Sequence, residues 1–137
     1  MTIYALDPEI FIIHFQAQAP LDTFTQKLFL QLENKQCHAL CSVLAFNQLL
    51  LLEQVRQDPV LQEEVKYLLE HIPNLKYLDI TQEIVLTATQ LQNKYQIALN
   101  DALHLATAIA QRADYYLTAN HNYRRVQDLK IKILSDI

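Results

Sequence analysis

The stretch Ile97–Asn120, IALNDALHLATAIAQRADYYLTAN, determines the predicted fold of this chain. Small and apolar residues recur in it at i, i+3, i+4, i+7, i+8 and i+11, namely Ala102, Leu105, Ala106, Ile109, Ala110 and Ala113. This spacing predicts one buried face of a helix, and its alanines allow the helix to lie close against a sheet. The segment Asp114–Thr118 that follows predicts a short buried strand.

Strands and helices are expected to alternate along the rest of the chain. Further apolar segments predict strands at Thr2–Leu6, His38–Ser42, Lys76–Ile80 and Lys130–Leu134. Helices are expected over Glu9–Gln16, from Asp22 past Leu32, over Leu44–Arg56, from Pro59 to Pro73 and from Thr81 past Leu91. The alternation predicts a single α/β domain, residues 1–137, built as a three-layer α/β/α sandwich around a mostly parallel sheet.

Turn and cap residues add local expectations. Asp22, Ser42, Asp58 and Thr81 are placed to cap the helices that follow them. The chain contains no glycine, which excludes glycine-rich phosphate loops and dinucleotide-binding fingerprints, so no nucleotide cofactor is expected. Left-handed turns are then expected at asparagines, with the candidates Asn34, Asn74, Asn93 and Asn100.

The composition indicates a contact surface for another protein. Hydrophobic residues make up 51% and charged residues 19% of the chain, and the charged share is below the usual quarter. The almost uniformly apolar turn Leu49–Leu52 therefore predicts either a central helix or an interface, such as that of a homodimer.

Charge and hydropathy also limit the partners and the location. The net charge of −4 argues against a broad nucleic-acid-binding surface. A basic edge at His121, Arg124 and Arg125 remains as a candidate contact for phosphate or RNA. No apolar run reaches the ~18–20 residues of a membrane span, and the N-terminus lacks a signal-like pattern, so we expect a cytoplasmic protein with no membrane partner.

The two cysteines, Cys37 and Cys41, lie four residues apart with His38 between them. A zinc site would need further ligands at suitable spacing, and the chain has no second cysteine pair. We therefore favour buried, reduced thiols along a strand.

Four polar positions are expected to converge at one edge of the sheet. Asp7 and Asn120 follow predicted strands, while Gln48 and Asp101 lie early in helices that follow connecting segments. Ligands of parallel α/β sheets bind beyond the carboxyl ends of the strands. Carboxylates gathered there would suit magnesium or manganese, because these hard ions prefer oxygen ligands.

The segments NDALHLATA and ADYYLT closely resemble the C-terminal motif of PIN domains, especially those of VapC-type toxins. The resemblance implies an α/β/α sandwich and a metal-dependent ribonuclease, with an antitoxin-like protein and RNA as partners. Asp7 and Asp101 match two of the family's acids and are the implied metal ligands. Gln48 and Asn120 stand where the family has Glu and Asp, so all four positions form the implied catalytic site.

Two of the four acids are thus replaced by amides, which bring no charge to a cation. We expect weak or lost nuclease activity; the alternatives are an inactive PIN domain that binds protein or RNA, and a fully active ribonuclease toxin. A phosphotransferase using Asp7 ranks below these. Glu9 could partly replace a lost acid, and Asp101 could instead complement the positive end of its helix. His104 is expected to be a packed or partly exposed histidine rather than a general base.

Overall fold

The computed structural model describes all residues of the chain, Met1–Ile137. Its centre is a five-stranded sheet in the order β3-β2-β1-β4-β5, and every pair of neighbouring strands is parallel. The predicted α/β class is confirmed, and the sheet is parallel throughout. The strands are β1 Ile3–Leu6, β2 His38–Ser42, β3 Leu75–Leu78, β4 Tyr115–Thr118 and β5 Ile131–Ile133.

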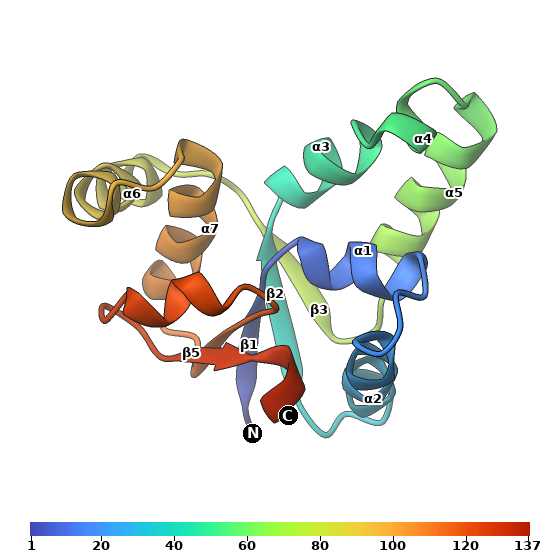
Figure 1. Cartoon of the computed structure of the whole chain (residues 1–137), viewed down its shortest axis with the longest axis horizontal. Coiled ribbons are helices and arrows are strands. Elements are labelled where there is room, and N and C mark those ends of the chain that lie inside the picture. Colours follow the sequence, from blue (N-terminus) through green and yellow to red (C-terminus); the bar gives the residue numbers. More distant parts are fainter.

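Helices cover both faces of the sheet (Figure 1). The larger group lies on one face and consists of α1 Glu9–Phe15, α2 Asp22–Glu33, α3 Leu44–Leu50, α4 Glu53–Arg56 and α5 Pro59–Glu70. The other face carries α6 Gln82–Tyr95 and α7 Leu99–Ala110, followed later by the short 3-10 helix η1 His121–Arg125. The C-terminal 3-10 helix η2 Leu134–Asp136 lies with the first group, because Leu134 belongs to the same core cluster. None of the helices is both long enough and apolar enough to span a membrane.

Alternating residues of the strands divide the core into two clusters. In β1, Tyr4 and Leu6 join the cluster under α1–α5, while Ala5 joins the cluster under α6 and α7. Cys37 and Cys41 are buried free thiols in the first cluster, and the Cys41 Sγ donates to the carbonyl of Leu6 at 3.3 Å.

Helix α7 packs against the sheet through the predicted small-residue face. Ala102, Leu105 and Ala106 are completely buried, and they contact the same cluster as Leu40 of β2 and Tyr116 of β4. With alanine rather than a larger side chain on this face, the helix backbone can approach the strands closely. This packing brings the first turn of α7 to the carboxyl ends of β1 and β4, which lie at the upper end of the sheet in Figure 1.

One predicted helix is broken in the structure. The expected helix Leu44–Arg56 is two helices, α3 and α4, because Leu52 adopts an extended backbone with φ −56° and ψ 140°. The break allows Val55 to enter the core, where it is 4% exposed. It also explains most of the apolar turn Leu49–Leu52, since Leu51 is its only strongly exposed member and the others contact the core.

The helix caps were predicted with mixed success. Asp58 Oδ1 accepts from the backbone N–H groups of Val60 and Leu61, each at 3.1 Å. Thr81 likewise accepts from Ile84 at 3.2 Å. Ser42 Oγ accepts from the Leu44 N–H at 3.2 Å, but the N-cap residue of α3 is Val43. The predicted cap at Asp22 is wrong: Asp22 lies inside the first turn of α2 and makes no cap bond.

Left-handed backbone falls mostly on residues other than asparagine. Of the four candidates only Asn74 is left-handed, with φ 56°, where its side chain donates to the Leu32 carbonyl at 2.7 Å. Because the chain has no glycine, several turns place ordinary residues in a conformation that costs them about 1–2 kcal/mol. These residues are Ala17, Lys35, Gln96 and Arg112.

Glycine at one of these positions should therefore stabilise the protein. Gln96 ends α6 with φ 57° and ψ 46°, so Gln96→Gly should raise the free energy of unfolding by up to about 1 kcal/mol. The matched change Gln90→Gly, on the exposed interior of the same helix, should lower it by about 0.5–1 kcal/mol. Urea unfolding of both variants measures the effect, and a loss of stability in Gln96→Gly would contradict the argument.

Candidate functional site

Asp7 lies at the carboxyl end of the central strand β1, and both of its carboxylate oxygens have protein partners. The hydroxyl of Thr118, at the end of β4, donates to Oδ2 at 2.7 Å. The backbone N–H of Glu9 donates to Oδ1 at 3.1 Å. The backbone N–H of Asp7 in turn donates to the Leu117 carbonyl at 2.9 Å. Asp7 is thereby fixed between β1, β4 and the start of α1.

Burial raises the pKa of Asp7 to about 6. The hydrogen bonds from Thr118 and Glu9 oppose this shift, because they favour the charged carboxylate, and the negative charges of Glu9 and Asp101 add to it. The charge of Asp101 thus acts on Asp7 at the carboxyl ends of β1 and β4, the edge of the sheet that we call the mouth.

Asp101 lies in the first turn of α7 and is half-buried beside Tyr123 of η1. Burial raises the pKa of the Tyr123 phenol, and a hydrogen bond to the Asp101 carboxylate raises it further. Tyr123 also packs edge-on against Tyr116, with ring centroids 6.0 Å apart. A phenol from η1 therefore lies beside this carboxylate.

Gln48 lies on α3, on the opposite side of the mouth from α7. Its Oε1 is 2.5 Å from Nε2 of His104, a residue of α7 that is 3% exposed. Burial lowers the pKa of His104 to about 4, so its ring is neutral at pH 7. His104 is thus a packed histidine, as predicted, and in addition it bonds to one of the four site positions.

Asn120 follows β4 and caps η1. Its Oδ1 accepts from the backbone N–H of Asn122 at 2.9 Å, and its own backbone N–H donates to Thr118 Oγ1 at 3.0 Å. The side-chain oxygen of Asn120 is therefore used in a local turn.

These residues do not fit a divalent cation as they are arranged. No three His, Cys, Asp or Glu side chains lie together in a group that could hold a metal ion. The oxygens of Asp7, Gln48 and Asn120 are each engaged in a hydrogen bond within the protein. Two of the ligands that these four positions could offer a cation would be uncharged amides.

The basic residues after β4 have partners of their own. Arg124 pairs with Asp136 at 3.1 Å on the surface, and the guanidinium of Arg125 donates to the Tyr95 carbonyl at 2.8 Å. His121 begins η1 and is exposed. An exposed ion pair such as that of Arg124 is worth only about 0–1 kcal/mol, so it could exchange for a phosphate; this role stays a prediction.

Sequence reasoning gave no role to Thr118 or Tyr123. Thr118 figures in it as the end of a predicted strand and with no side-chain partner, although a hydroxyl at the end of the strand next to β1 could have been expected to reach Asp7. Tyr123 gave no signal, because its contact with Asp101 depends on the turn of η1. The catalytic roles of Asp7, Gln48, Asp101 and Asn120 and the metal-binding roles of Asp7 and Asp101 also stay predictions.

The raised pKa of Asp7 predicts a specific pH dependence of stability. A carboxyl whose folded pKa exceeds its ordinary value of 3.8 binds a proton more tightly in the folded state. Its contribution to the free energy of unfolding therefore falls as the pH rises from 3.8 to about 6 and is constant above that range. Without divalent ions, the free energy of unfolding of the wild-type protein should fall between pH 4 and pH 7 by on the order of 2–3 kcal/mol relative to that of Asp7→Asn. Urea unfolding at both pH values tests this, and parallel curves for the two proteins would contradict it.

Known proteins share this architecture. VapBC2 from Rickettsia felis, solved bound to a DNA fragment from its promoter, has a chain that matches with a TM-score of 0.73 and 20% identity over 96% of this chain and 98% of that one. A toxin–antitoxin complex from Klebsiella pneumoniae matches with a TM-score of 0.70 and 18% identity over 100% of both chains. DNA-bound VapBC from Salmonella typhimurium matches with a TM-score of 0.72 and 14% identity over 98% and 99%.

Sequence comparison gives the family. Among curated proteins, no sequence matches this chain. The PIN domain family matches residues 29–129, which include Gln48, Asp101 and Asn120. The chain belongs to the PIN domain family.

Proposed function

We propose that this protein is a VapC-like PIN domain whose ribonuclease activity is weak or lost. PIN domains are in general nucleases that depend on divalent metal ions, and RNA is the substrate we infer for this one. The observation that carries the proposal is the chemistry of the mouth. Two carboxylate positions hold amides, and the side-chain oxygens of Asp7, Gln48 and Asn120 are already hydrogen-bonded.

Charge arithmetic supports a loss of metal affinity. A pair of unit charges ~4 Å apart is worth ~4 kcal/mol at an effective dielectric of ~20, and a divalent ion doubles this gross figure. Desolvation offsets much of it. Replacing two carboxylates with amides should nonetheless reduce the affinity by orders of magnitude.

An RNA cleavage assay tests the proposal. With Mg²⁺ or Mn²⁺, the unmodified protein should cleave structured RNA no faster than Asp101→Asn, because neither would hold a catalytic ion. Robust magnesium-dependent cleavage by the unmodified protein, abolished by Asp101→Asn, would overturn the proposal in favour of an active ribonuclease toxin.

Restoring the acids should restore metal binding. The double variant Gln48→Glu/Asn120→Asp adds two charged oxygens at the mouth and should bind Mn²⁺ at least tenfold more tightly than the wild type, measured by isothermal titration calorimetry. An aspartate in place of Asn120 can keep the cap on Asn122, since its oxygen accepts the same bond. Without metal the double variant should be less stable than the wild-type protein, because it has two more carboxylates that repel the others at the mouth.

Neighbouring asparagines supply a matched control for this experiment. Asn47→Asp/Asn122→Asp adds the same charge next to the same two positions, on exposed side chains. The control should not gain Mn²⁺ affinity. An equal gain in both double variants would mean that net charge, rather than the mouth, attracts the ion.

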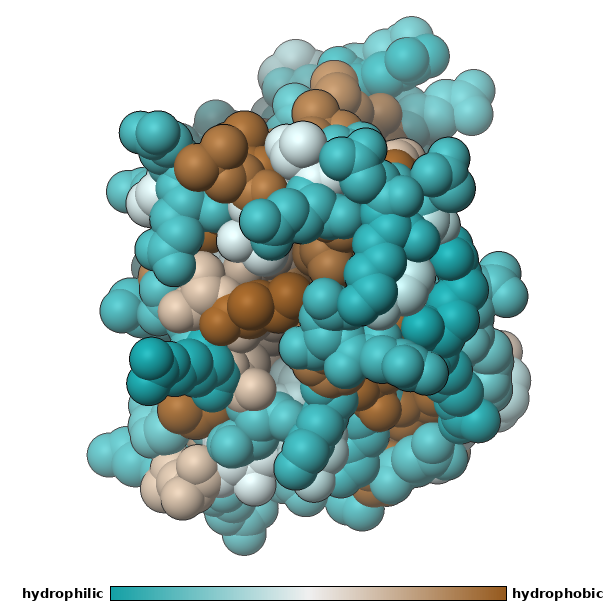
Figure 2. Space-filling view, turned by 90° about the vertical axis from the view of Figure 1, so that its left-hand side faces the viewer, coloured by the Kyte–Doolittle hydropathy of each residue, from teal (hydrophilic) through white to brown (hydrophobic).

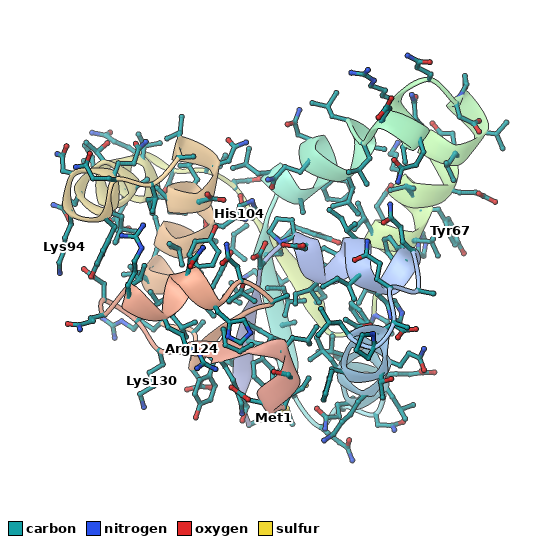
Figure 3. The ribbon with its side chains drawn as sticks, in the orientation of Figure 1. Met1, Tyr67, Lys94, His104, Arg124 and Lys130 are labelled. Atoms are coloured by element: carbon teal, nitrogen blue, oxygen red, sulfur yellow. The ribbon has the colours of Figure 1, made fainter.

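A second candidate function, binding another protein chain, is favoured by the surface between α2 and α5. A groove there is lined by Phe29, Leu30, Tyr67, Leu68 and Ile72 among others. Tyr67 is 61% and Leu68 47% exposed, and Figure 3 shows Tyr67 on the outer side of α5. On the side that carries α6, by contrast, hydrophobic surface is broken by hydrophilic side chains (Figure 2). We infer that this groove contacts an antitoxin-like protein or a second copy of the chain.

The homodimer form of this inference is directly measurable. We expect the wild-type protein to be a dimer by light scattering at high concentration, and Leu68→Glu to shift it to monomer because a charge would be buried in the interface. Leu86→Glu, on the exposed face of α6, is the control and should stay dimeric. A monomeric wild type, or dissociation by Leu86→Glu alone, would contradict the assignment of the groove.

A further inference from the structure

The bond between His104 and Gln48 joins helices from opposite faces of the sheet. His104 lies one turn after Asp101, on the side of α7 that faces the middle of the molecule (Figure 3). Its Nε2 is 2.5 Å from Oε1 of Gln48 on α3. Its Nδ1 is buried and has no hydrogen-bond partner. The ring of His104 therefore has one polar contact, the side chain of the site residue Gln48.

The geometry determines which atom carries the proton. The oxygen of the Gln48 amide faces the ring, and an amide oxygen only accepts hydrogen bonds, so Nε2 must be the donor. A neutral imidazole has a single N–H, which leaves Nδ1 unprotonated. An unpaired Nδ1 lone pair is then the only unsatisfied side-chain atom in the buried interior.

This arrangement decides what Gln48 offers to a ligand. Its oxygen is held against α7, and its NH₂ group has no protein partner. Among buried side-chain nitrogen and oxygen atoms, only His104 Nδ1 lacks a hydrogen-bond partner. The NH₂ group of Gln48 also has no partner, so it is not buried and reaches solvent. The free atom at position 48 is thus a hydrogen-bond donor, which repels a cation and suits an acceptor oxygen of a ligand, such as one on RNA.

We propose that His104 is the positioning residue for position 48: it binds one terminal oxygen of the side chain there and directs the other terminal atom toward the mouth. With glutamine that atom is an NH₂ group, and with glutamate it would be a carboxylate oxygen. Carboxylate ligands of metal ions are commonly oriented by such a second hydrogen bond. The inference rests on the proposed function, since it takes the mouth to be a metal site that has lost its charges.

The protonation of the ring can be observed in the unmodified protein. Long-range ¹⁵N–¹H NMR at pH 7 should show His104 as the Nε2–H tautomer, with the nitrogen shift of an unprotonated Nδ1. The Nδ1–H tautomer, or a doubly protonated ring, would overturn the proposal, because the amide of Gln48 would then face the ring with its NH₂ group or the pair would not form.

A mutant cycle tests the positioning itself. His104→Leu keeps a buried apolar side chain but removes the donor, whereas His104→Gln places an amide N–H near the position of Nε2. In the Gln48→Glu background, His104→Leu should weaken Mn²⁺ binding tenfold or more, and His104→Gln should keep it within about threefold. Equal Mn²⁺ affinity of Gln48→Glu with and without His104→Leu would overturn the proposal.

Folding and function are separable in this design. Circular dichroism and thermal melting show whether each variant is folded, and if His104→Leu does not fold, the NMR result on the unmodified protein still decides. Metal-dependent RNA cleavage by the wild type would overturn the proposed function but leave the tautomer unchanged. If NMR showed the Nδ1–H tautomer, the proposed role of His104 would be overturned, but the proposed loss of ribonuclease activity would be unaffected.

Discussion

The close packing of α7 on the sheet is the constraint on which the rest of the structure depends. Ala102 and Ala106 are completely buried between the helix and the strands, and a larger side chain at either position would push the helix outward. The same packing places Asp101 near Asp7 at the carboxyl end of β1, and it buries His104 where α3 can reach it. Fold and site therefore share one set of contacts, and the small residues of α7 serve both.

At the mouth of the sheet, polar groups form hydrogen bonds within the protein. Burial already raises the pKa of Asp7, and the nearby carboxylates Glu9 and Asp101 raise it further. Carboxylates at Gln48 and Asn120 would add to this repulsion unless a cation balanced them. Amides remove the repulsion and allow ordinary hydrogen bonds to His104 and Asn122. Under the proposed function, the amides of Gln48 and Asn120 would weaken metal binding and would also relieve carboxylate repulsion in the metal-free mouth.

Hydrophobic periodicity and cap residues were sufficient to predict the order of the elements, because both are local properties of the chain. The break at Leu52 was not predictable, since nothing in the run of leucines distinguishes a helix from two helices whose turn buries Val55. Nor was the left-handed Gln96, which no glycine or asparagine marks. At the site, positions after strands could be found from sequence, but the hydrogen bonds of Thr118 and His104 depend on side-chain directions that only the packed structure determines.

The central claim is that the mouth satisfies its own oxygens and does not hold a divalent cation. Anomalous diffraction from crystals of the unmodified protein soaked in Mn²⁺ tests this most directly, because it locates the ion. The account predicts no manganese peak between Asp7 and Asp101 and an intact Thr118–Asp7 hydrogen bond near its 2.7 Å. An ordered ion at about 2.1 Å from both carboxylates would contradict it.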